Sequence, residues 1–391
     1  MTNNIRRNFR SFDIILVVLV IALAAFGLLM IGSITGLGDG HVSAIFINQL
    51  IFLVTGIAIM LLAAFINFET ICKFYLPIFG VNILLLIIVL IIPTEHATVA
   101  RWIGFTIAGT PMGVQPSEFA KIFTVIFLAA IISKYQDKIN NIAVVGMVVG
   151  STALTVGLIL LQRSLSASTV PIVIMLAMLF VGKIGYRYII ITMLIVIPAA
   201  LFFFIELHAE NPLLLGEIME PWQRDRIWSF LYPQAGTDAV FQNEAAQRAF
   251  SSGLLTGRGL FTYYEEFPRF FVPEATNDFI FSIVGLEFGF LGTVVLLVLI
   301  LAIVMRCLLI AYRSKVFLGK LLAVGVATTI AFQTFFHVGV NTWLLPNTGI
   351  NLPFVSSGGS AMWVFMAMIG LVLNVGMTQE YSMFDDFGGK K

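Results

Sequence analysis

Hydrophobic residues of this 391-residue chain fall into long runs that short polar segments separate. A transmembrane helix needs about 20 consecutive apolar residues. Ten runs approach or exceed that length, at residues 14–35, 46–66, 74–93, 116–133, 142–161, 167–182, 187–205, 279–305, 321–345 and 358–378. The pattern therefore predicts an all-α integral membrane protein with about ten transmembrane helices.

Two of the segments between these runs are long. Residues 94–115 join the third and fourth expected spans, and residues 206–277 join the seventh and eighth. No linker or low-complexity tract divides the chain. We therefore expect residues 1–391 to form a single polytopic membrane domain, with one large extracellular loop at 206–277 between spans seven and eight.

The distribution of basic residues predicts the orientation of the chain. An even number of spans places both termini on the same side of the membrane. Lys and Arg are about twice as frequent in the segments on that side as on the other, and cytoplasmic segments carry an excess of Lys and Arg. We therefore expect both termini to be cytoplasmic.

The composition is typical of a membrane protein, and the net charge argues against one class of partner. Hydrophobic residues make up 59% of the chain and charged residues 11%, and the mean hydropathy is +1.00. Soluble domains carry about 25% charged residues. The net charge of +1 argues against nucleic acid as a partner.

Asp278 is the last charge before the uncharged run 279–286, at the outer mouth of the eighth expected span. A carboxylate at that place can cap the helix by accepting a backbone N–H. It can also face lipid-linked substrates where water and lipid headgroups meet, and act there as a catalytic group. The sequence allows both interpretations.

The motif at 115–121 opens the fourth expected span and contains Glu118 and Lys121. Residues three apart share one face of a helix. Ionisable groups inside a membrane are costly and usually line a cavity or a pathway; the alternative is a self-neutralising pair near the interface. Spans four and eight both run inward, so Glu118 and Asp278 are expected at similar depth.

The large loop holds five Arg and no Lys. The planar guanidinium suits the oxygens of phosphate and pyrophosphate, although structural pairing with the acidic residues of the loop is the alternative. Arg224 and Arg226 are the best candidates for a ligand role. The glycine-rich run 253–260 can cradle phosphate with backbone N–H groups, but a tight turn explains it as well.

The last outer loop, residues 345–360, contains two prolines and three glycines. Irregular backbone at membrane depth is tolerated where protein or a cavity satisfies its polar groups. This loop can therefore line a site or form an ordinary re-entrant turn. His337, in the ninth expected span, is expected to be a core histidine.

Together these motifs resemble the SEDS family (shape, elongation, division and sporulation), which includes RodA, FtsW and SpoVE. The resemblance covers nearly the whole chain, and the segment from 346 to 360 is its most specific part. It rests on Ala100 to Ile103, Gln115 to Ile122, Trp222 to Ile227, Gly253 to Leu260, Thr276 to Phe281, Gly285 to Gly292 and Gln333 to Ser360.

The resemblance implies a bacterial plasma-membrane glycosyltransferase that polymerises lipid II into peptidoglycan, with a class B penicillin-binding protein as its partner. It assigns the essential aspartate to Asp278, which we expect to act directly or through a divalent cation such as Mg²⁺ or Mn²⁺. The residues expected to bind substrate are Glu118, Lys121, Arg101, Arg224, Arg226, Ser356, Ser357 and Gly358.

Some positions depart from the family pattern. Ser164 stands where the family has an acid, Leu286 replaces a glutamate, His337 an asparagine and Ser357 a tyrosine. Two other functions are therefore considered: a transporter or flippase of the lipid-linked precursor, and a catalytically impaired scaffold of a cell-wall synthesis complex. A transporter binds at the membrane midplane between matched halves, which the sequence does not show.

Overall fold

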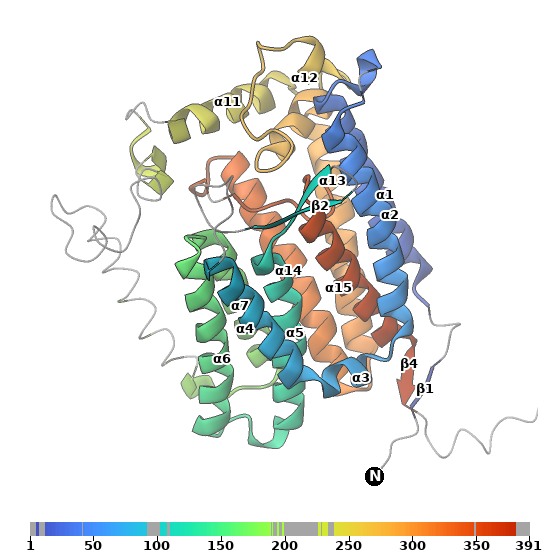
Figure 1. Cartoon of the computed structure of the whole chain (residues 1–391), viewed down its shortest axis with the longest axis vertical. Coiled ribbons are helices and arrows are strands. Elements are labelled where there is room, and N and C mark those ends of the chain that lie inside the picture. Colours follow the sequence, from blue (N-terminus) through green and yellow to red (C-terminus); the bar gives the residue numbers. More distant parts are fainter. Residues whose placement is uncertain are drawn as a thin grey trace, which may run out of the picture.

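Long apolar helices make up most of the fold (Figure 1). The computed structural model describes residues 5–7, 12–40, 42–91, 102–107, 110–188, 190, 194, 198, 226–227, 229–233, 238–347 and 349–380. Seven of the helices in this part of the chain are long and apolar enough to cross a membrane: α1 (Ile14–Ile34), α2 (Ala44–Phe65), α5 (Pro116–Lys134), α6 (Ile142–Leu161), α13 (Ile280–Arg313), α14 (Phe317–Asn341) and α15 (Gly359–Met377). The chain is thus a multi-pass membrane protein.

Two shorter apolar helices, α4 (Tyr75–Ile91) and α7 (Leu165–Val181), accompany the long ones. Together these helices match nine of the ten runs that the sequence predicts as spans, with ends that differ by a few residues. The seventh expected span, 187–205, lies almost entirely outside the described residues.

Several helices begin where the sequence supplies a capping side chain. Asp13 accepts a hydrogen bond from the amide of Leu16 at 2.9 Å. Ser43 accepts one from the amide of Phe46 at 3.1 Å. Such caps satisfy amides that have no partner inside the helix, and they place the first turns of α1 and α2 at defined residues.

Smaller elements complete the description. They are the helices α3 (Phe68–Lys73), α11 (Asp238–Ser252) and α12 (Thr262–Glu265), the 3₁₀ helices η2 (Leu37–Asp39) and η3 (Gln136–Lys138), and the strands β1 (Ile5–Arg7), β2 (Ile103–Ile107), β3 (Thr110–Val114) and β4 (Thr378–Glu380). The strands form two short antiparallel pairs, β2 with β3 and β1 with β4, which accompany the helices without changing the all-α class of the fold. The apolar side chains of β2 alternate with Gly and Thr, the period of a strand.

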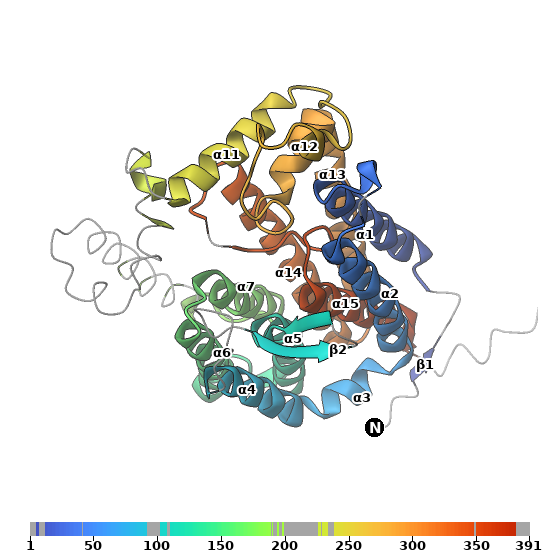
Figure 2. The same cartoon turned by 45° about the horizontal axis from the view of Figure 1, so that its top comes forward.

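α15 is the most deeply enclosed of these helices. It contacts α2, α5, α13 and α14 (Figure 2), and nearly all of its residues are buried. α13 and α14 also pack along each other, and α5 contacts both α14 and α7. The N-terminal ends of α5, α7 and α15 meet the C-terminal part of α14 around one cavity.

α13 is interrupted near its N-terminal end. Gly289 has φ +66° and ψ −167°, which is not helical. This conformation favours glycine because it lacks a Cβ, and a Cβ there would lie 2.3 Å from the amide nitrogen of Gly257. The kink therefore lets the glycine-rich segment 253–260 approach the α13 backbone.

The glycine-rich segment uses its backbone groups on this kink. The amides of Arg258 and Gly259 donate to the carbonyls of Leu286 and Glu287, each at 3.0 Å. The carbonyls of Leu254 and Leu255 accept from the first amides after the kink, at 2.9 and 3.0 Å. The segment is therefore a tight turn docked on α13, and the alternative of a phosphate cradle is wrong.

Candidate functional site

A cavity of about 510 Å³ lies at the N-terminal ends of α5, α7 and α15 and beside the C-terminal part of α14. Among the described residues, its charged lining consists of Glu118, Lys121, Arg226, Glu274 and Asp278. Ser357 and Gly358 also line it, so the structure brings six of the residues predicted from the sequence into one site. Arg101 and Arg224 lie outside the described residues.

Asp278 lies just before α13, and its side chain lines the cavity. The N-cap residue of α13 is Phe279, whose side chain makes no capping hydrogen bond. The amide of Ser282 in the first turn bonds instead to Oδ1 of Asn341, at 3.0 Å. The interpretation of Asp278 as a helix cap is therefore wrong, because a residue of α14 fills that role.

Asn341 also holds the backbone of Asp278. Its Nδ2 donates to the carbonyl of Asp278 at 2.9 Å and to the carbonyl of His337 at 2.8 Å, and its Oδ1 accepts from the hydroxyl of Ser282 at 2.8 Å. Its side chain is buried. One amide thus fixes Asp278 relative to both α13 and α14. The sequence reasoning missed Asn341; its only signal was an asparagine within an apolar span.

The last outer loop packs along the segment that precedes Asp278. Ser356 Oγ donates to the carbonyl of Asn277 at 2.7 Å, and the amide of Ser357 donates to the carbonyl of Thr276 at 2.9 Å. Gly358 donates its amide to Gln49 Oε1 at 3.1 Å. Of the expected loop residues, Ser357 and Gly358 line the cavity and Ser356 positions its wall.

Arg226 and Asp278 meet beside Gly349. A Cβ at Gly349, whose φ is +71°, would lie 3.2 Å from Asp278 Oδ2 and 3.8 Å from Arg226 Nη1. Burial lowers the pKa of Arg226, and the Asp278 carboxylate opposes that shift. Since arginine keeps its proton in proteins, a fixed positive charge stands beside the carboxylate.

Glu118 and Lys121 form a closed ion pair in the wall of the cavity. Lys121 Nζ lies 2.7 Å from both carboxylate oxygens of Glu118, and the two side chains are only 2% and 9% exposed. The lysine nitrogen also lies 5.6 Å from the ring centroid of Phe365. Buried charges of this kind need their partner, and both residues line the cavity.

Neutral polar groups extend the site. Gln333 lines the cavity, and its buried Oε1 has no hydrogen-bond partner among the described residues. Such an oxygen is costly unless a water or a ligand bonds to it. Sequence reasoning did not single out Gln333. Ser164 lines the same cavity, while His337 is buried with Nδ1 2.7 Å from the carbonyl of Ile350, a core histidine as predicted.

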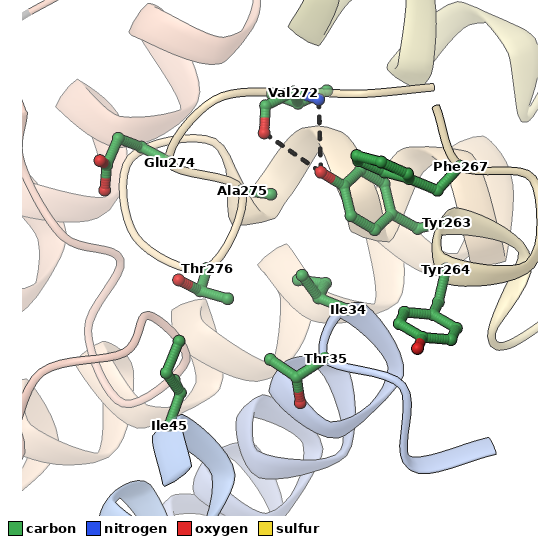
Figure 3. Close-up of a pocket in the computed structure, with 10 residues that line it drawn as sticks. All are labelled: Ile34, Thr35, Ile45, Tyr263, Tyr264, Phe267, Val272, Glu274, Ala275 and Thr276. Atoms are coloured by element: carbon green, nitrogen blue, oxygen red, sulfur yellow. Dashed lines mark hydrogen bonds between the residues drawn. The ribbon is translucent and has the colours of Figure 1, made fainter. Parts of the chain in front are cut away.

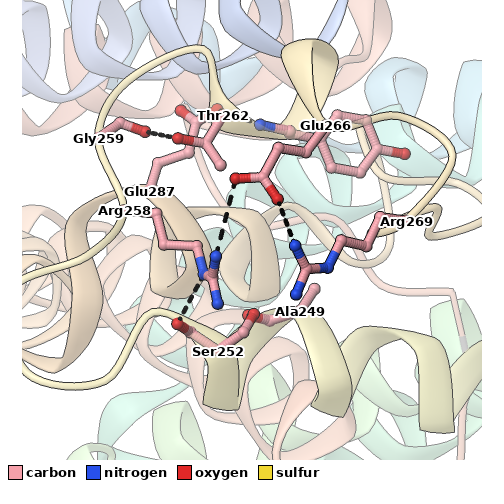
Figure 4. Close-up of polar contacts among 9 residues, drawn as sticks. Ala249, Ser252, Arg258, Gly259, Thr262, Glu266, Arg269 and Glu287 are labelled. Atoms are coloured by element: carbon pink, nitrogen blue, oxygen red, sulfur yellow. Dashed lines mark hydrogen bonds and ion pairs between the residues drawn. The ribbon is translucent and has the colours of Figure 1, made fainter.

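Other arginines of the large outer segment have structural roles. Arg258 Nε donates to the carbonyl of Ser252 at 3.0 Å, and Arg258 Nη1 lies 3.7 Å from Glu266 (Figure 4). Arg269 pairs with the same carboxylate at 3.2 Å. For these two residues structural pairing is confirmed. Of the described arginines in this segment, Arg226 is the one that lines the cavity.

Among the described residues, no group of three His, Cys, Asp or Glu side chains could hold a metal ion. Protein groups alone therefore do not build a metal site in this part of the chain. Mg²⁺ is commonly held by one or two carboxylates together with substrate phosphates. Asp278, with neutral amides of Asn277 and Asn351 in the same cavity wall, fits that sparse mode of binding. Glu118 does not fit it, because Lys121 occupies both of its oxygens.

Known proteins share the sequence and the fold. The FtsW/RodA/SpoVE family model, described as "Cell cycle protein", matches residues 13–381. A relative from Trichlorobacter lovleyi, named "Probable peptidoglycan glycosyltransferase FtsW", is 29% identical over 96% of each chain.

Two solved structures resemble the chain. One, described as "Structural coordination of polymerization and crosslinking by a peptidoglycan synthase complex", has a TM-score of 0.74 at 26% identity and covers 93% of this chain and 97% of that one. The rod shape determining protein RodA of Thermus thermophilus has a TM-score of 0.65 at 23% identity, covering 94% and 98%, and shows the shared fold. The chain belongs to the FtsW/RodA/SpoVE (SEDS) family of cell cycle proteins.

Proposed function

We propose that this protein is a peptidoglycan glycosyltransferase that polymerises lipid II, the undecaprenyl-pyrophosphate-linked disaccharide peptide, during bacterial cell-wall synthesis. The observation that carries the proposal is the cavity of about 510 Å³ whose lining includes the carboxylate of Asp278 and two cations, Arg226 and Lys121. The name of the Trichlorobacter lovleyi relative, a probable peptidoglycan glycosyltransferase, supports the same activity.

The reaction joins two lipid-linked sugars. The oxygen of an acceptor hydroxyl forms a bond to the anomeric carbon of the donor, and the bond from that carbon to the pyrophosphate breaks. Asp278 accepts the hydroxyl proton, a role that typically contributes 10²–10⁴-fold to a rate. The pyrophosphate leaves with both electrons of the broken bond.

The two cations of the cavity are suited to the leaving group. Arg226 presents a planar fork of N–H donors, which matches phosphate oxygens. Lys121 is a point charge held in place by Glu118. Donors fixed before the reaction stabilise developing charge without reorganising. Arg101 and Arg224 are proposed to add to this set.

A divalent cation fits the same chemistry. Asp278 would hold Mg²⁺ or Mn²⁺ together with pyrophosphate oxygens, and the ion would neutralise charge on the leaving group. With or without it, Arg226 orients the Asp278 carboxylate, and Asn341 fixes the backbone that carries it.

The orientation and the partner follow from the proposed reaction. Lipid II is polymerised outside the cytoplasmic membrane, so the cavity and the segment 206–277 face outward and both termini face the cytoplasm, with about ten spans in all. One similar solved chain belongs to a complex described as a peptidoglycan synthase complex that coordinates polymerisation and crosslinking. We propose a class B penicillin-binding protein as the crosslinking partner.

The test is polymerisation by the purified full-length chain. Incubated with lipid II, it should yield glycan strands that a muramidase degrades. If the chain in vesicles moved lipid II across the bilayer and formed no polymer, it would be a flippase. If folded protein supplied with its partner formed no polymer and moved no lipid II, the chain would be a scaffold.

A further inference from the structure

A second cavity, of about 650 Å³, shares Glu274 with the first, and Figure 3 shows the residues that line it. It is formed by the outer ends of α1 and α2 and by the chain from α12 to Thr276. Glu274 lines both cavities, so the two adjoin at this residue, which belongs to the same short segment as the proposed catalytic Asp278. A ligand that occupied both cavities would pass Glu274.

The walls of this pocket are held in place. The hydroxyl of Tyr263 donates to the carbonyl of Val272 at 3.2 Å and accepts from its amide at 3.3 Å (Figure 3). Burial raises the pKa of Tyr263 above its usual value, and the bond to Val272 opposes this, so the hydroxyl stays neutral near pH 7. The ring of Tyr264 packs on Gly36, where a Cβ would lie 2.6 Å from it.

The charges of the two cavities differ. The catalytic cavity contains Lys121 and Arg226, whereas Glu274 is the only charged side chain among the described residues that line the second pocket. A pocket without cations is a poor site for pyrophosphate. The carboxylate of Glu274 disfavours anionic ligands and leaves the pocket open to neutral ones.

The lining also has the character of a site for an amphipathic ligand. The rings of Tyr264 and Phe267 are 37% and 56% exposed, and Thr35 and Thr276 add hydroxyls. Aromatic faces with a few placed polar groups are typical of small-molecule pockets, whose volumes run from about 300 to 1,000 Å³. A sugar unit has matching apolar faces and hydroxyl edges.

We propose that this pocket binds neutral N-acetylated sugar units of the glycan strand next to the reacting pair. The proposal rests on the proposed function, because a polymerising enzyme must hold a strand whose further sugar units carry no pyrophosphate. The strand then runs from the Asp278 cavity, past Glu274, over the rings of Tyr264 and Phe267.

The first test measures binding without catalysis. Chitotetraose, a neutral N-acetylglucosamine oligomer, is titrated against the full-length protein in detergent and followed by saturation-transfer NMR. Binding should weaken roughly three- to tenfold in Tyr264→Ala and in Phe267→Ala, the range expected for one aromatic contact. Phe241→Ala is the matched control, since Phe241 is 48% exposed on α11 and does not line the pocket.

Chitotetraose binding that is absent from the wild type, or equal in all three variants, would overturn the proposal. Farnesyl phosphate is the competing probe: if it alone gives signals that depend on Tyr264 and Phe267, the pocket holds a lipid tail and the proposal is wrong. Asp278→Asn should bind chitotetraose like the wild type. Should the wild type bind chitotetraose in this way and yet make no polymer, the pocket assignment stands and the proposed function fails.

The second test measures strand length. Strands made from lipid II by Phe267→Ala should be shorter than those made by the wild type and by Phe241→Ala, because a weakly held strand dissociates sooner. Phe267 is partly exposed, so its replacement leaves the core intact. If Tyr264→Ala and Phe267→Ala both made strands of wild-type length, the proposal that this pocket binds the glycan strand would be contradicted.

Discussion

Three carboxylates share the proposed catalytic cavity, and their neighbours give them different roles. Both oxygens of Glu118 bind Lys121. Glu274 is exposed and accepts a hydrogen bond from Asn277 at 2.9 Å. Asp278 meets Arg226 beside Gly349, and its backbone is bonded to Asn341. Of the three, Asp278 is the acid that the sequence singled out, and it is the one that combines a neighbouring arginine with a backbone fixed by Asn341.

Asn341 is predicted to be a positioning residue. Asn341→Ala removes the bonds to Ser282, Asp278 and His337, so Asp278 shifts from its place. Because a small misplacement can cost about a hundredfold in rate, kcat for polymerisation should fall on the order of ten- to a hundredfold while KM for lipid II changes little.

Thr342→Ala is the matched control for this prediction. Its hydroxyl bonds only within α14, to the carbonyls of Val338 and Gly339, so its removal should leave kcat near that of the wild type. An equal fall in Thr342→Ala, or an effect of Asn341→Ala confined to KM, would contradict the positioning role.

Ser164 offers a second prediction at this scale. It is the N-cap of α7, makes no side-chain cap bond and lines the cavity. Ser164→Asp would place a carboxylate at a helix N-terminus, where negative charge is favourable. We expect equal or raised polymerisation and a lower requirement for Mg²⁺ or Mn²⁺, measured by titrating both ions on both proteins. A clear loss of activity in folded Ser164→Asp would show that the serine is an adapted part of the site.

At the scale of elements, apolar periodicity and length predict the membrane helices well. Nine of the ten expected runs coincide with described helices because a span must satisfy its backbone internally and be apolar along its length. The same pattern cannot predict β2 and β3, because these two strands pair with each other in a short segment that lies between helices. Nor can it predict the kink at Gly289, which exists because the segment 253–260 docks there.

The site was predictable in part for the same reason. Charged residues in apolar runs are rare enough to be noticed, and Asp278, Glu118 and Lys121 were found in this way. Asn341 and Gln333 carry no charge, and their importance comes from contacts between α14 and residues 278–282 or the cavity. Such contacts between distant segments have no local sequence signal.

The Gly289 kink leads to a stability prediction. Gly289→Ala adds a Cβ 2.3 Å from the amide nitrogen of Gly257, at a residue with positive φ. The docked segment 253–260 must then shift, and the thermal unfolding midpoint should fall by several degrees. Gly150→Ala in α6, where a Cβ meets nothing within 4 Å, should be neutral or slightly stabilising. Equal midpoints for the two variants would contradict the role of the kink.

At the scale of the whole molecule, the two ends of the described chain lie together. Ile5 of β1 pairs with Glu380 of β4. The proposed orientation puts this pair in the cytoplasm and α11 outside. The two native cysteines, Cys72 and Cys307, are free and buried, and burial raises the pKa of the Cys72 thiol to about 12, so neither should react with added reagents.

That background allows a labelling test of orientation. Ser251→Cys, at an exposed position in the last turn of α11, should react with a membrane-impermeant maleimide in intact cells. Lys138→Cys, exposed between α5 and α6, should react only after permeabilisation. The reverse pattern would show that the cavity faces the cytoplasm, and the proposed reaction outside the membrane would then be wrong.

The most direct measurement of the whole account is lipid II polymerisation by purified Asp278→Asn. The substitution keeps size and removes the charge that accepts the proton, so the rate should fall by roughly 10²-fold or more, while lipid II binding and the thermal unfolding midpoint stay close to those of the wild type. Glu265→Gln, an exposed carboxylate outside the cavity, should polymerise at the wild-type rate. Polymerisation by folded Asp278→Asn at a rate near that of Glu265→Gln would contradict the central claim that Asp278 carries the chemistry.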